Sequence, residues 1–288
     1  MDKFGYNYVL EVGTDTGGIL QIEPPFTIAF DIIRNTLTSA NVCQVRIYNL
    51  SVNNRSKLRF NASNYGEFRM IRLSAGFGQR IKTIFTGNIS QAWSVREGVD
   101  MVTTIECYDG GFAFQNGVVS RTYPAETDQK EIYRDLIGTL PHVEVGKIGE
   151  FGGTLSRANS YMGITADVLY DISGGAFFVD AGKGNVLGTN EYFSNGGPIT
   201  KISAETGLLG TPVLEQSIVH VDMLFEPGLE PGTLVLLDSI TERSFNNNVD
   251  GLYKITGVKH RGMISESVAS SVVTTGEFFF SKLLTEVS

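Results

Sequence analysis

Apolar and polar residues alternate along much of the first part of the chain, and this period of two predicts β-strands. The apolar side chains of residues 26–32 and of residues 43–47 each fall on one face. Turn-forming sequences such as Ala75–Gly78 and Asp109–Gly111 separate the strands. Short strands at this spacing are typical of an antiparallel barrel or sandwich. Further strands are predicted at residues 71–77, 82–89 and 101–108.

A short helix interrupts this pattern between Ser51 and Phe60. Ser51 can accept a hydrogen bond from the first turn of such a helix, which would turn Leu58 towards the interior. The first β region therefore carries one short helix on its surface.

Helical spacing replaces the alternation in residues 119–198. A capping-box pattern from Asp128 to Glu131 predicts the start of an amphipathic helix that ends near Pro141. A second helix is predicted over Tyr161–Ser173, ended by Gly174 and followed by a strand over Ala176–Asp180. Its inward-facing residues are expected to be Met162, Ala166, Leu169 and Ile172.

Strand alternation returns in the last part of the chain, as in the apolar face of Val219–Phe225. The fold class expected is mainly β (α+β), with two antiparallel β domains and a small α/β insert between them. The similarity between the two β regions lies in their pattern and not in their sequence. The predicted division is a first β domain over 1–118, an insert over 119–198 and a second β domain over 199–288.

Composition and charge narrow the classes of function. Of the 288 residues 42% are hydrophobic and 19% charged, as in a folded protein, and the net charge of −8 lacks the basic surface that tight nucleic-acid binding needs. An acidic surface would let DNA slide past without sticking, but mild acidity is also the ordinary property that keeps many soluble proteins dispersed. Cys43 and Cys107 fall in strand patterns and are expected to be buried and reduced. With no signal peptide or membrane-spanning segment in the sequence, assembly in the cytoplasm is expected.

Residue patterns for catalysis and for metal or cofactor binding are not found in the sequence. A Gly-x-Ser-x-Gly motif is missing, and His142, His220 and His260 have no partner at a diagnostic spacing, so we interpret them as structural. The loop Asp180–Glu191 has acidic residues at the first and last ligand positions of an EF-hand calcium loop. Glycines stand at two of the positions where oxygen ligands are needed, which favours a hairpin turn. We therefore expect no catalytic residue, no metal site and no cofactor.

Aromatic residues offer candidates for contacts with other chains. Trp93 is expected in the core, whereas the three consecutive phenylalanines at 278–280 cannot all face the same way in a strand. Part of this run should meet either another element of the chain or a neighbouring subunit. The candidate subunit-interface residues are Val219, Val221, Met223, Phe225, Phe278, Phe279 and Phe280.

A set of short sequence segments from the predicted strands and turns, taken in their order along the chain, resembles the central baseplate hub proteins of contractile bacteriophage tails. These proteins share a plan of two tube-like barrels with the base of VgrG spikes. None of these segments carries a catalytic motif, and their order along the chain makes the resemblance specific. They are Val45–Ser51, Leu73–Phe77, Ile84–Ile89, Tyr108–Gly110, Ile202–Pro212, Leu224–Gly232 and Tyr253–Gly262.

This resemblance implies a non-enzymatic structural hub in the virion. Three subunits with two tube-like barrels each would form a pseudo-sixfold ring that joins the hexameric tail tube to a trimeric spike or needle and leaves a channel for DNA. The tape measure protein and baseplate wedge proteins are further expected neighbours. The insert is expected to pack outside the ring.

Two other classes of function remain open at the level of sequence. One is a receptor-binding or carbohydrate-binding tail protein, which the β-rich composition allows. The other is a tail-associated cell-wall hydrolase, for which no nucleophile or pair of acids stands out.

Overall fold

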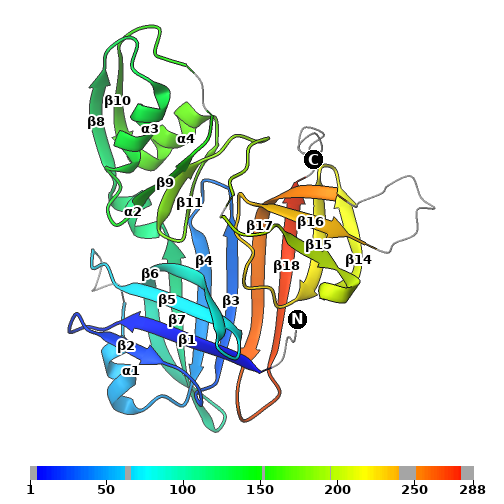
Figure 1. The fold of residues 1–288 in the computed structure, drawn as a ribbon. Coiled ribbons are helices and arrows are strands. Elements are labelled where there is room, and N and C mark those ends of the chain that lie inside the picture. The colour runs from blue at the N-terminus through cyan, green and yellow to red at the C-terminus, as the bar shows by residue number, and fades with distance from the viewer. Residues whose placement is uncertain (1–4, 62–65, 151–152, 195, 240–250, 280–288) are drawn as a thin grey trace.

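The computed structural model describes residues 5–61, 66–150, 153–194, 196–239 and 251–279. Its largest element is a 13-stranded sheet, and the protein is mainly β as predicted from the alternating pattern. Figure 1 shows the insert standing at one end of this sheet, above the strands of the first β region.

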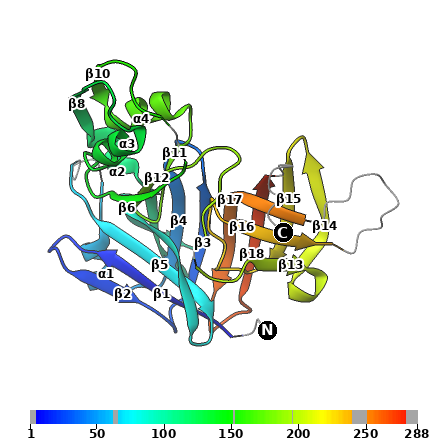
Figure 2. The same cartoon turned by 45° about the horizontal axis from the view of Figure 1, so that its top comes forward.

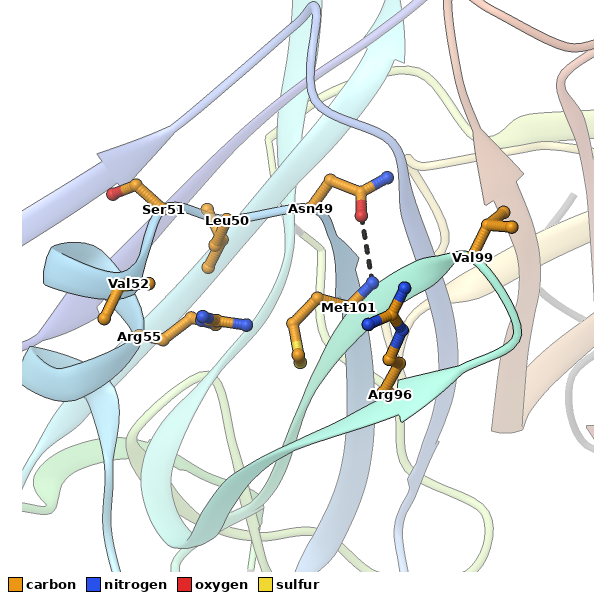
Figure 3. Close-up of a pocket in the computed structure, with 8 residues that line it drawn as sticks. All are labelled: Asn49, Leu50, Ser51, Val52, Arg55, Arg96, Val99 and Met101. Atoms are coloured by element: carbon orange, nitrogen blue, oxygen red, sulfur yellow. Dashed lines mark hydrogen bonds between the residues drawn. The ribbon is translucent and has the colours of Figure 1, made fainter.

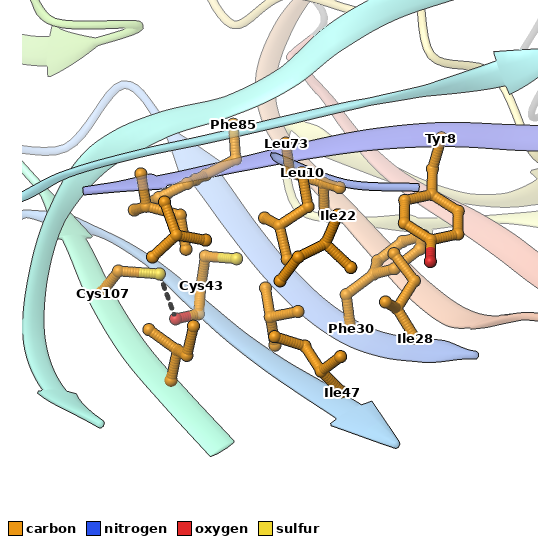
Figure 4. Close-up of a cluster of buried hydrophobic side chains, with 14 of the residues drawn as sticks. Tyr8, Leu10, Ile22, Ile28, Phe30, Cys43, Ile47, Leu73, Phe85 and Cys107 are labelled. Atoms are coloured by element: carbon orange, nitrogen blue, oxygen red, sulfur yellow. Dashed lines mark hydrogen bonds between the residues drawn. The ribbon is translucent and has the colours of Figure 1, made fainter. Parts of the chain in front are cut away.

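The first β region forms around a single apolar cluster. Ile28, Phe30 and Ile32 point into it from one strand, as the alternation predicted, whereas Phe26 is 37% exposed. Figure 4 shows these side chains meeting those of the strands that cross above them. The strands are β1 (Tyr6–Gly13), β2 (Ile19–Ile22), β3 (Ile28–Asn35), β4 (Asn41–Tyr48), β5 (Met70–Phe77), β6 (Arg80–Glu97) and β7 (Asp100–Asp109).

The short helix of this region is α1 (Val52–Leu58), and it begins where the sequence predicted. The hydroxyl of Ser51 accepts a hydrogen bond from the Asn54 amide at 3.3 Å, and Leu58 is buried. Both features of the predicted helix are confirmed.

Two helices of the insert pack on a small sheet around a second apolar cluster. The first begins at Asp128, whose carboxylate accepts a hydrogen bond from the Lys130 amide at 2.8 Å. It ends at Ile137, before the predicted Pro141. The elements are α2 (Gly111–Asn116), β8 (Val118–Tyr123), α3 (Gln129–Ile137), β9 (Glu144–Ile148), β10 (Asn159–Ile164), α4 (Thr165–Ser173), β11 (Phe177–Asp180) and β12 (Lys183–Val186).

The second predicted helix was wrong in its first turn. Residues 159–164 form β10, which pairs antiparallel with β8, and the helix α4 starts only at Thr165. Met162 lies opposite Ser120 in this ladder and is 77% exposed, so it does not face the core. The end of the helix is confirmed, since Gly174 adopts a left-handed conformation with φ of 63°.

The loop that was compared with an EF-hand calcium loop, at Asp180, begins as a hairpin turn, as predicted. β11 and β12 pair antiparallel up to Asp180 and Lys183, and Ala181 and Gly182 between them both have positive φ.

The second β region has a third apolar cluster of its own. Its side chains come from alternate positions of strands that follow the predicted pattern. The elements are β13 (Thr200–Ser203), the 3₁₀ turn η2 (Ala204–Thr206), β14 (Leu208–Glu215), β15 (Ile218–Leu224), β16 (Leu234–Asp238), β17 (Gly251–Ile264) and β18 (Ser271–Phe279).

The two β regions repeat one strand arrangement, which we call the β unit. The order β3-β4-β7-β6 in the first unit matches β14-β15-β18-β17 in the second, and in each unit the matching strands occur in the same order along the chain. A further strand pairs with the long fourth strand of each unit: β5 with β6, and β16 with β17. One irregularity is shared, because β6 is bulged after Ile89 and β17 after Ile255, whereas the shift of β14 between Leu209 and Val213 is missing from the β3–β4 ladder.

The two β units form one continuous sheet, because β17 of the second pairs with β3 of the first. Figure 2 shows these strands side by side between the two units. The three apolar clusters lie mainly within the three segments predicted as domains, but three residues from the second β region join the first cluster. The three-domain division itself stays a prediction.

Candidate subunit interface

The junction between the two β units shows how such units bind each other. β17 and β3 form an antiparallel ladder from Gly257 opposite Asn35 to Ile264 opposite Ile28. Next to this ladder Phe225 is fully buried, and the centroid of its ring lies 5.8 Å from that of the Phe77 ring. The junction therefore combines backbone hydrogen bonds with burial of apolar side chains.

Each β unit also has a second strand edge that corresponds to one side of this junction, and among the described residues no neighbouring β unit pairs with it. By the repeat, β6 corresponds to β17 and β14 corresponds to β3. On the side of β6 away from β7, Phe60 pairs with Ala92, and no described residue pairs with residues 93–97. Among the described strands β14 pairs only with β15. In the described part of the chain, β6 and β14 therefore present free edges that complement each other.

Apolar side chains are exposed along both edges. Trp93 and Val95 of β6 are 38% and 43% exposed, and Val213 and Leu214 of β14 are 53% and 41% exposed. The prediction that Trp93 lies in the core was wrong, because Ala92 faces the apolar cluster and Trp93, the next residue, points to the opposite face of β6. The counterpart of Leu214 in the first unit is Ile32, which the β17–β3 junction buries completely.

The predicted interface residues lie mostly inside the chain. Val219, Val221, Met223 and Phe278 are at most 1% exposed and belong to the apolar cluster of the second unit. Their side chains are occupied within the subunit, as are those of their counterparts in β4 and β7 of the first unit. This burial moves the candidate interface from these side chains to the exposed edge strand β14.

The other predicted interface residues have different surroundings. Phe225 is buried in the junction between the two β units. Phe279 is half-buried at the end of β18, opposite Ile218 and Lys254, and Phe280 lies outside the described residues. The role of Phe279 at a subunit interface stays a prediction. Sequence alone did not reveal the free edges, because edge status depends on which strands pair.

A buried ionic network attaches the insert to the first β unit. Arg34 donates two hydrogen bonds to Asp180, at 2.8 and 2.6 Å, and Asn41 donates to Asp180 at 3.0 Å. Asp109 accepts a hydrogen bond from the Gly182 amide at 3.1 Å. Because buried charges need partners, this network fixes the position of the β11–β12 hairpin.

Two buried charges near the insert have unusual acidities. Burial and the nearby charge of Asp180 raise the pKa of the Asp109 carboxyl to about 7, against the opposing effects of the Gly182 amide and Arg34. Burial lowers the pKa of the Lys254 ammonium to about 8, and this group donates hydrogen bonds to the carbonyls of Gly188 and Thr189. The second β unit thereby contacts the end of the insert.

Replacing Asp109 with asparagine is expected to stabilise the protein at pH 8. The folded-state pKa lies above the ordinary value of 3.8, so the stability linked to this proton is full below about pH 4 and is lost as the pH rises through about 7. Asparagine keeps an acceptor for Gly182 and stays neutral. Urea unfolding should show a gain of about 1–3 kcal/mol at pH 8 that vanishes near pH 4.

The exposed Asp15 provides the control, since Asp15→Asn should change stability equally little at both pH values. An unchanged pH dependence in Asp109→Asn would contradict a neutral Asp109 in the folded protein.

The cysteines and histidines occupy structural positions. Cys43 and Cys107 are free, buried and opposite each other in β4 and β7, as predicted, and burial raises the pKa of the Cys107 thiol. His142 stacks on Phe68 with ring centroids 3.9 Å apart, and His260 is buried with Nδ1 2.9 Å from the Thr274 hydroxyl. In the described parts of the chain no three His, Cys, Asp or Glu residues are grouped to hold a metal. None of the described helices is long and apolar enough to cross a membrane.

The fold is that of phage tail proteins. The tail protein from Neisseria meningitidis MC58 is 12% identical with a TM-score of 0.63, and each chain is covered to 98%. The 43 kDa tail protein of prophage MuSo2 from Shewanella oneidensis is 7% identical with a TM-score of 0.60, covering 97% of this chain and 98% of that one. The c3393 protein of E. coli, a component of the type VI secretion system, is 10% identical with a TM-score of 0.52, covering 90% and 75%.

The sequence itself assigns the family. The profile of the baseplate hub gp41 family matches residues 9–261, and the chain belongs to this family. A comparison with curated proteins gives no significant match. The chain is therefore a structural component of a phage tail baseplate, with tail and baseplate proteins as its partners.

Proposed function

We propose that three copies of this chain form a closed ring in which six β units surround a channel. The observation that supports this most strongly is the junction inside the chain, where β17 of one unit binds β3 of the other. The equivalent junction between copies joins β6 of one subunit to β14 of the next. Three chains then supply six similar junctions, three within subunits and three between them.

The repeated register specifies the residues of this junction. Alignment of the two bulges makes Arg261 the counterpart of Val95, and the β3–β4 and β14–β15 ladders make Asp31 the counterpart of Val213. Since Arg261 lies opposite Asp31, Val95 should lie opposite Val213 of the next subunit. Val95 and Val213 would then meet as a cross-strand pair on the face that carries Arg261 and Asp31, whereas Leu214 would be covered on the apolar side, as Ile32 is.

The face of the sheet opposite the apolar clusters is proposed to line the channel. Asp31 lies within 4 Å of both Lys259 and Arg261 on this face and offsets one of their two positive charges. Glu106 and Glu277 lie on the same face, on strands whose neighbouring residues point into the cores. An acidic lining repels phosphates and lets DNA pass without binding.

The ring resolves a mismatch of symmetry between its proposed partners. A hexameric tail tube needs six similar contacts, whereas a spike or needle with threefold symmetry needs three. In a ring of three chains, the two similar units of each chain present six contacts at the end that faces the tube. The differences between the two units leave threefold symmetry at the end that faces the spike. The insert packs outside the ring, where it can meet tape measure or wedge proteins. This role requires no catalytic step.

Electron microscopy of the purified chain, alone and mixed with its tube and spike proteins, tests the proposal. Class averages should show a ring of three copies with six lobes and an open centre. A particle that remains a monomer in all mixtures would exclude the ring.

A further inference from the structure

A pocket of about 360 Å³ opens where α1 meets the tip of the β6–β7 hairpin. Arg55 reaches into it from α1 and Arg96 from β6, as Figure 3 shows. Two strongly exposed apolar side chains lie beside these cations, Val52 at 72% and Val99 at 90%. The pocket thus combines positive charge with apolar surface.

The pocket lies on a surface of the first β unit whose counterpart on the second β unit is covered by the first unit within the chain. The backbone amide of Asn49 bonds to the carbonyl of Met101, and both residues line the pocket. Continuing the β15–β18 register by one position makes Phe225 and Val272 their counterparts. Those two residues are at most 2% exposed, because they pack against the first unit in the junction within the chain. The pocket is therefore the same docking surface without its neighbouring unit.

The two arginines have no acidic partner in the described residues. The guanidinium of Arg96 donates one hydrogen bond to the Gly98 carbonyl of its own hairpin. The nearby acids are already engaged, since Glu97 pairs with Arg46 at 2.5 Å and Asp100 accepts from Asn49 at 2.8 Å. An occupant with a carboxylate would balance the positive charge.

We propose that the pocket binds the start of the second β unit of the next copy of this chain, with Glu205 facing Arg55 and Arg96. This inference rests on the proposed ring. In the junction within the chain Ile264 lies opposite Ile28, and their counterparts are Gly98 and Leu208. Because β14 is bulged between Leu209 and Val213, this correspondence comes from the pairing of Leu208 with Met223 on β15, and it brings Leu208 of the next copy close to Gly98, beside the pocket.

The segment before Leu208 carries the matching chemistry. The turn η2 (Ala204–Thr206) ends two residues earlier, and Glu205 is exposed on it. Among the described residues no cation lies within 4 Å of the Glu205 carboxylate; Lys201, on which its charge acts, forms its own ion pair with Asp238. Leu208 is itself only partly buried at the end of its own apolar cluster, so it offers apolar surface to Val52 and Val99.

The test uses a disulfide that reports ring formation. In the variant Val95→Cys/Val213→Cys, mild oxidation with copper phenanthroline should give crosslinked products up to a covalent trimer on a denaturing gel. The pair Val118→Cys/Val213→Cys is the matched control, because Val118 is 71% exposed on the insert, away from the junction. It should give little crosslinked product.

Charge reversal in the Val95→Cys/Val213→Cys background then tests the pocket. Arg96→Glu should slow crosslinking about tenfold, and adding Glu205→Arg should restore most of the rate. Arg80→Glu, at an exposed position at the other end of β6, should leave the rate unchanged.

The outcomes separate the two proposals. If crosslinking between Val95→Cys and Val213→Cys does not occur, the ring with this register is wrong. If it occurs at the same rate with Arg96→Glu, or if Glu205→Arg does not restore the rate, the ring stands and the docking of Glu205 is wrong.

Discussion

Replacing Leu214 with lysine is expected to prevent ring formation while leaving the isolated subunit folded. Leu214 points towards the apolar side of β14, yet 41% of its surface is exposed because the strand is an edge. In the ring this side chain would take the buried position that Ile32 has within the chain. A lysine there would bury an ammonium without a partner. Sedimentation velocity should show about 100-fold weaker association, corresponding to about 2.8 kcal/mol for each contact.

The control is a lysine on β2, the edge strand at the opposite end of the sheet. Ile19 is 60% exposed on β2, which ends the sheet on the far side of the first unit. Ile19→Lys should associate like the unchanged protein, and both variants should keep its thermal stability within about 0.5 kcal/mol. Equal loss of association in the two variants would argue against a specific β6–β14 junction.

Replacing Phe225 with alanine is expected to destabilise the subunit itself. Phe225 belongs to the second β region by sequence but is fully buried in the apolar cluster of the first. Its ring lies 6.3 Å from that of Tyr6 and 5.5 Å from that of His260. Removing a buried phenylalanine leaves a cavity and lowers the free energy of unfolding by about 3–5 kcal/mol, measurable by urea denaturation.

Leu224 gives a matched comparison at the neighbouring position. It is 39% exposed on the opposite face of β15, so Leu224→Ala should cost less than about 1 kcal/mol. Similar losses for the two variants would mean that the junction between the units contributes little to stability.

The sequence predicted local structure well wherever one face of an element is buried. Alternation placed Val219, Val221 and Met223 on one buried face of β15, and Ser51 marked the start of α1. Such patterns arise because period two or a cap residue is needed for the element to form at all. The start of α4 was missed because Tyr161 to Ile164 fit both a helix turn and a short strand, and pairing with β8 decides between them.

The interface was harder to predict because it depends on pairing between distant segments. Val219 was a candidate because it lies on an apolar strand face, and Phe278 because it begins a run of three phenylalanines, but both pack in their own subunit's core. Trp93 was expected in the core as a single aromatic residue, and only the strand pairing shows that Ala92, and not Trp93, faces the apolar cluster. The repeat of the two β units likewise lies in strand order and bulges, not in residue identities.

Cryo-electron microscopy of the assembled hub tests the central claim most directly, because it can resolve which strands meet between subunits. We predict β6 of each copy antiparallel to β14 of the next, with Val95 opposite Val213, in a closed ring of three. A ring whose subunits meet through other strands, or one with a different number of copies, would contradict the equivalence of the junctions.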